Sequence, residues 1–75
     1  MHDYSFSAYV EKDVESGLYV GIVPNLPGAH TQAATLDELQ KNLREVAELC
    51  LQELPKEEVK SLAEFIGIQT VPVHI

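Results

Sequence analysis

The 75-residue sequence has almost none of the residues from which very small proteins build covalent or metal cross-links. Its single cysteine, Cys50, excludes a disulfide within the chain and a four-cysteine zinc site. No stretch approaches the roughly 20 apolar residues of a membrane span, and the N-terminus has no basic segment followed by an apolar one, as a secretory signal would. We therefore expect one domain over residues 1–75, located in the reducing cytoplasm and without membrane contact.

Basic residues are also scarce. Twelve Asp and Glu face five Lys and Arg, for a formal net charge of −7. Such a field repels phosphate backbones and attracts cationic partners. This balance argues against direct nucleic-acid binding. By itself it fits either an acidic surface that keeps a small domain soluble or a docking face for a basic protein.

Motifs of catalysis are missing as well. The sequence has no nucleophile elbow, no glycine-rich phosphate loop and no H-E-x-x-H. His30 has no second His, Cys or carboxylate at ligand spacing. Glu11 and Asp13 lie near the end of a predicted strand, but most other acids fall on helix surfaces, whereas two-metal hydrolysis needs convergent carboxylates in a sheltered site. We expect no enzymatic activity, no metal and no cofactor.

Alternation of apolar and polar residues predicts a strand over residues 4–11 and a second over 18–23, joined by a charged hairpin loop that ends in glycine. A short third strand follows at 30–33. On the helix-facing side of the first two strands the alternation places Tyr4, Phe6, Ala8, Val10, Leu18, Val20 and Ile22. Tyr9 and Tyr19 are then expected on the far face, together with Val23.

Architectural signals surround the third strand. Pro24, Pro27 and Gly28 predict a turn that leaves the sheet and returns to it. Thr35 and Glu38 have the capping-box spacing T-x-x-E ahead of an apolar periodic run.

That run predicts an amphipathic helix over about residues 36–54, ended by Pro55. Residues 56–63 have helical spacing for one or two further turns, and 65–73 are rich in strand-forming residues. A helix crossing to a last strand parallel to the first gives a right-handed connection. The predicted fold is α+β: two-layer β-β-β-α-β, a small, mostly antiparallel sheet of order 3-2-1-4 with one helix on one face.

A family resemblance rests on the strand G-L-Y-V-G-I-V-P, the turn N-L-P-G and the helix opening T-L-D-E-L. In this order they resemble the HicB-like antitoxin domain over about residues 6–54. The resemblance implies a truncated ribonuclease-H-like fold and a role in a toxin-antitoxin system: such domains bind and mask HicA, a small basic toxin that cleaves messenger RNA. No basic recognition helix follows, so we expect a short form that lacks the family's C-terminal DNA-binding module.

From charge and resemblance together we expect a non-catalytic antitoxin that covers a small basic HicA-like toxin. A domain this small buries a limited core, so a homo-oligomer, dimer or tetramer, is also expected. Two alternatives are a self-associating domain without a toxin and a small-ligand binder on the open sheet face. The partner-contact residues we predict are Tyr9, Glu11, Asp13, Glu15 and Tyr19, with Glu45 and Glu48 as a second patch. Pro24, Pro27, Gly28, Thr35 and Glu38 are assigned to architecture.

Overall fold

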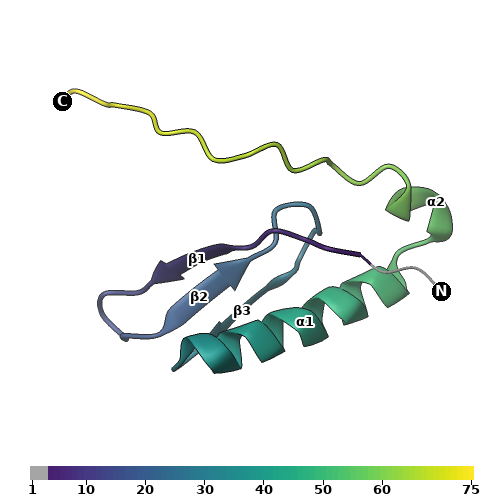
Figure 1. Ribbon diagram of the computed structural model, residues 1–75, viewed down its shortest axis with the longest axis horizontal. Helices are drawn as coiled ribbons and strands as arrows, with labels where there is room; N and C mark the ends of the chain where they lie inside the picture. Colours follow the sequence, from purple (N-terminus) through teal and green to yellow (C-terminus); the bar gives the residue numbers. More distant parts are fainter. Residues whose placement is uncertain (1–3) are drawn as a thin grey trace.

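The computed structural model, which describes residues 4–75, is a small α+β fold in which one long helix lies across a three-stranded antiparallel sheet (Figure 1). The sheet order is β1-β2-β3. The elements are β1 (Tyr9–Lys12), β2 (Tyr19–Ile22), β3 (His30–Ala33), α1 (Leu36–Glu53) and α2 (Lys56–Val59). The third strand and the long helix lie where their sequence patterns predict them.

The strand register determines which side chains share a face. Tyr9 lies opposite Ile22 and Glu11 opposite Val20, with Val10 opposite Gly21 between them. A Cβ atom built on Gly21 would lie 2.9 Å from the Leu43 methyl groups of α1. The face that carries Gly21 is therefore the one that α1 covers, and residues one position away point to the open face.

This register corrects the predicted facing of β2. Successive side chains of a strand point to opposite faces of the sheet, so Val20 and Ile22, on either side of Gly21, lie on the open face and not under the helix. Tyr19 and Val23 lie on the helix side, where Val23 is buried and Tyr19 packs against the core. The prediction for Tyr9 is confirmed, since it lies opposite Ile22 on the open face. Apolar side chains occur at both the odd- and the even-numbered positions of residues 18–23, so alternation alone did not show which side chains face the helix.

The core lies between α1 and the β2–β3 side of the sheet. Leu26 and Leu39 are each only 1% exposed, and the turn after β2 carries the first of them. The other buried apolar residues are Val23, Ala29, Ala33 and Leu43. The turn is closed by the Leu26 amide, which donates to the Val23 carbonyl at 3.1 Å, and Gly28 adopts a φ of 81° that favours glycine. Pro24-Asn25-Leu26-Pro27 thus drives a leucine into the core.

The N-terminus of α1 is capped as its sequence predicts. Thr35 has an extended backbone, and its Oγ1 accepts from the Glu38 amide at 3.1 Å. Asp37 and Glu38 place negative charge in the first helical turn, where it stabilises the helix dipole. No helix in residues 4–75 has the length and apolarity needed to cross a membrane.

The two chain ends differ from the predicted strands. The first strand begins at Tyr9 rather than at residue 4, and the second helical segment stops at Val59. The predicted last strand over residues 65–73 is not formed: this segment is irregular and runs from α2 back along the length of the molecule, separate from the sheet (Figure 1). The predicted four-stranded order 3-2-1-4 is therefore not formed in the described part of the chain. The side chains of residues 65–73 are exposed.

Candidate functional site

A hollow of about 440 Å³ lies where the open sheet face meets the β1–β2 hairpin, and we call it the acidic hollow. It is lined by Glu11, Lys12, Asp13, Val14, Glu15, Val20 and Gln32. Three of the predicted contact residues, Glu11, Asp13 and Glu15, thus line one hollow. One lysine stands against three carboxylates, so the hollow favours a cationic group.

The strand register builds one wall of this hollow. Glu11 on β1 lies opposite Val20 on β2, and Val20 lies opposite Gln32 on β3. These three side chains therefore form a row across the open face, with the carboxylate at the β1 edge. The apolar Val20 at its centre offers contact area to the stem of a lysine or arginine side chain.

The hairpin loop holds Asp13 in a fixed conformation. Its Oδ2 accepts from the Ser16 hydroxyl at 2.7 Å and from the Ser16 amide at 3.0 Å. The Gly17 amide donates to the Asp13 carbonyl at 2.8 Å, and Gly17 has a φ of 76°. The hydrogen bonds from the Ser16 hydroxyl and then its amide lower the pKa of Asp13 below its usual 3.8. Asp13 therefore shapes the loop and stays ionised, while Glu15 lies exposed on the same hairpin.

A second row lies beside the acidic hollow on the open face. Tyr9, Ile22 and His30 face one another across the three strands. Tyr9 is 42% exposed and Ile22 is 45% exposed. This row continues the acidic hollow into a surface that combines charge with aromatic and aliphatic contact, as protein interfaces often do.

Tyr19, which we predicted on this face, lies on the opposite side. Its ring packs against the core, and the Lys12 Nζ lies 5.6 Å from the ring centroid. This cation–π contact links β1 and β2 on the helix side. Tyr19 is therefore not brought together with Tyr9 and the acidic hollow.

Glu45 and Glu48 form a separate patch. Both are exposed on α1, on the helix layer of the molecule. Glu48 lines a hollow between α1 and residues 4–8, together with Arg44. Because α1 packs on the face opposite the acidic hollow, the structure does not unite these two acidic regions.

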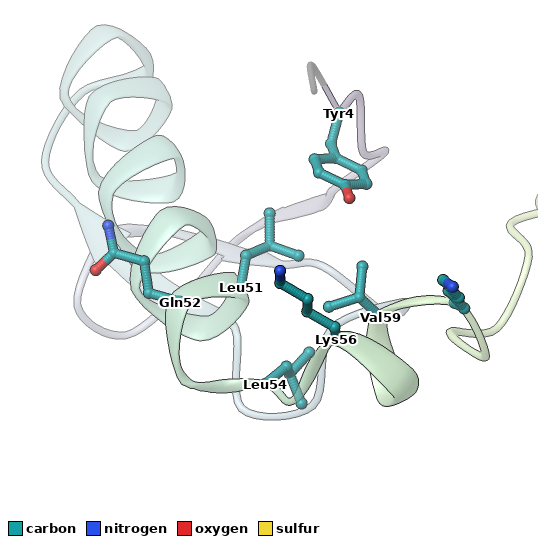
Figure 2. Close-up of a pocket in the computed structure, with 7 residues that line it drawn as sticks. Tyr4, Leu51, Gln52, Leu54, Lys56 and Val59 are labelled. Carbon is teal, nitrogen blue, oxygen red and sulfur yellow. The ribbon is translucent and has the colours of Figure 1, made fainter. Parts of the chain in front are cut away.

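Another hollow, of about 450 Å³, lies at the junction of α1 and α2, and no sequence motif pointed to it. Its lining residues are Tyr4, Leu51, Gln52, Leu54, Lys56, Val59 and Lys60. Figure 2 shows Lys56 and Val59 of α2 pointing toward Leu51 of α1, with Tyr4 across the gap. Its apolar lining consists mainly of Leu51 and Leu54, before Pro55, and Val59, after it. The helical spacing of apolar residues on both sides of Pro55 is the signal in the sequence that relates to this hollow.

Cys50 and the histidines do not gather into a reactive cluster. The Cys50 thiol is half-buried and contacts the Pro27 carbonyl at 3.8 Å. His30 lies on the open sheet face and His74 on the exposed C-terminal segment. Within residues 4–75, no group of three His, Cys, Asp or Glu side chains has an arrangement that could hold a metal ion.

Comparison with known proteins places the chain among proteins named UPF0150. It is 48% identical over 73 residues to a UPF0150 protein of Synechocystis sp., with 97% of this chain and all of the relative covered. It is 43% identical to one of Thermotoga maritima (92% and 89% covered) and 50% identical to one of Archaeoglobus fulgidus (91% and 93%). No protein-family profile and no solved structure matches the chain. The names of these relatives state a family and no activity.

Proposed function

The chain belongs to the UPF0150 family, and from that premise we propose that it is a cytoplasmic, non-catalytic antitoxin domain that binds and masks a small basic HicA-type toxin. The proposal includes the HicB-like relationship and a truncated ribonuclease-H-like fold. It also includes self-association of the chain into a dimer or tetramer.

The observation that carries the proposal is the acidic hollow. Glu11, Asp13 and Glu15 line one depression beside the exposed Tyr9. A cationic side chain from a partner fits such a site by charge and by its apolar stem. An acidic cover on a basic RNA-binding protein associates quickly and with strong salt dependence. Inhibition then occurs by occlusion of the toxin surface, without any bond broken by this chain.

The sequence resemblance supports the same proposal. The strand, the N-L-P-G turn and the capped helix occur in the order typical of HicB-like domains. In the structure this stretch forms β2, the leucine-bearing turn, β3 and the start of α1. The resemblance therefore covers the part of the molecule that sets the sheet and helix in place.

The test begins with a search for a small basic protein encoded beside this chain, which is then purified and assayed for cleavage of messenger RNA. We expect stoichiometric addition of the chain to abolish cleavage at about 50 mM salt and to do so less well at about 500 mM, because screening weakens exposed charge pairs. Unchanged cleavage at an excess of the chain would contradict the proposal. Cleavage of RNA by the chain alone with a divalent cation, lost in Glu11→Gln, would contradict its non-catalytic part.

A further inference from the structure

The C-terminal segment has the composition of a strand but no neighbour. Between Phe65 and Ile75 the sequence has no Asp, Glu, Lys or Arg, although 23% of the whole chain is charged. Its aliphatic side chains are exposed: Ile66, Ile68, Val71, Val73 and Ile75. An extended, uncharged and apolar segment in water is unfavourable, and pairing with a sheet edge removes that cost.

The base of this segment is fixed to the domain. Leu62 packs against the core, and the Asn25 side-chain amide donates to the Ala63 carbonyl. From Ala63 the 12 remaining residues span at most about 40 Å when extended. Figure 1 shows them running away from α2 and clear of the sheet. The segment thus has a defined origin and enough length to reach a second molecule.

The edge of β1 supplies the complementary backbone. β1 pairs only with β2 in the described sheet. The Asp13 amide donates to the Leu18 carbonyl at 2.8 Å, so the alternating backbone groups of Val10 and Lys12 point to the outer edge. Pro72 has no amide to donate, which requires the odd-numbered residues of the C-terminal segment to face that edge.

We propose that residues 65–73 of each chain pair with the β1 edge of a second copy, so that two chains exchange their C-terminal segments. The helix α1 packs against β3 and β2, and all four residues of β1 are exposed. A fourth strand at the β1 edge would lie still farther from α1 than β1 does, so a single chain would leave its apolar side chains largely exposed. A second copy supplies another layer to cover them.

The exposed area of the single chain agrees with this exchange. Folded monomers of its mass, 8.3 kDa, expose about 4,600 Å², whereas this chain exposes 6521 Å². The excess, about 1,900 Å², exceeds the roughly 800 Å² per partner of a standard interface. Reciprocal exchange closes as a two-fold dimer, and the uncharged segment allows two chains of net charge −7 to meet.

The oligomeric state tests the exchange in the full-length chain. Light scattering coupled to gel filtration should give the mass of a dimer. Val71→Asp adds a charge to the exchanged segment and should raise the dimer dissociation constant at least about tenfold. Val14→Asp is the matched control, because Val14 is 95% exposed and Val71 is 70% exposed. A monomeric wild-type chain, or equal effects of the two substitutions, would overturn the proposal.

Mixed-label NMR separates exchange from pairing within one chain. A nitroxide is attached at Thr70→Cys in a Cys50→Ser chain of natural isotope content, which is mixed with the ¹⁵N-labelled wild-type chain. The Tyr9–Lys12 amides of the ¹⁵N chain should lose intensity. Loss seen only when label and ¹⁵N share one chain shows pairing within the chain and overturns the exchange.

This inference rests on the self-association in the proposed function and needs no toxin. A dimer that fails to stop RNA cleavage contradicts the antitoxin function alone. A monomer that stops RNA cleavage contradicts the exchange and the self-association, and leaves the antitoxin function standing.

Discussion

Substitution of Gly21 by alanine tests how α1 meets the sheet. Gly21 is buried on β2, and a Cβ atom there would lie 2.9 Å from both Leu43 methyl carbons and 3.2 Å from Leu43 Cγ. Leu43 is itself only 8% exposed, so its side chain has little room to turn aside. The added methyl must push α1 away from the sheet or force Leu43 out of its rotamer.

Two opposing effects determine how much Gly21→Ala changes the free energy of unfolding. Overpacking of a buried contact costs about 1 to 3 kcal/mol. Replacing glycine also removes conformational freedom from the unfolded chain, which stabilises by about 0.4 to 1 kcal/mol. We therefore expect Gly21→Ala to lower the free energy of unfolding by about 1 to 2 kcal/mol, measured by urea titration at fixed chain concentration.

A double-mutant cycle with Leu43→Ala separates this clash from other effects. Leu43→Ala alone should cost about 2 to 5 kcal/mol because it leaves a cavity. In that background the clashing atoms are gone, so Gly21→Ala should be neutral or slightly stabilising. If Gly21→Ala destabilises equally in both backgrounds, or has no effect in the wild type, the helix does not lie on this face of β2.

Three further predictions concern stability. Ile22→Ala on the open face should cost less than about 1 kcal/mol in urea unfolding, whereas Leu26→Ala should cost about 2 to 5 kcal/mol; equal costs would contradict the face assignment. Thr35→Ala should cost about 1 kcal/mol and lower helicity by circular dichroism, since it removes the cap; an unchanged midpoint would refute that role. Because the pKa of Asp13 is lowered in the folded chain, its carboxylate stabilises the fold at pH values above 3.8, and this stabilisation is lost as the pH falls below 3.8. Ser16→Ala should reduce this acid-induced loss of stability, and an identical dependence of stability on pH in the variant would exclude the hydrogen bonds as its cause.

The sequence predicted the structure best where only one hydrophobic periodicity, that of a helix or that of a strand, fitted the residues. Leu39 and Leu43 fall on the apolar stripe that predicted α1, and the Thr35 capping pattern fixed its start. The facing of β2 was not predictable in the same way, because glycine at position 21 gives no hydropathy signal. Its lack of a side chain is what admits Leu43, so a position with no hydropathy signal is one at which α1 packs tightly on the sheet.

The ends of the chain show a different limit. Residues 65–73 have strand composition, yet a strand forms only where an edge accepts its backbone groups. In the acidic hollow the hairpin acids were predicted as contacts, but the Asp13 side chain is engaged by Ser16 three residues later. The D-x-x-S-G spacing was visible in the sequence and is typical of a side chain that closes its own turn.

Association rates of two charge-matched double variants distinguish binding at the acidic hollow from attraction by net charge. Glu11→Gln with Glu15→Gln neutralises the acidic hollow, and Glu57→Gln with Glu58→Gln removes the same charge from the exposed start of α2. Binding of the basic partner protein is followed by stopped flow at low salt. We predict at least about a tenfold loss of association rate for the first pair and less than about threefold for the second. Equal losses would show that net charge alone drives binding and would contradict a contact site at the acidic hollow.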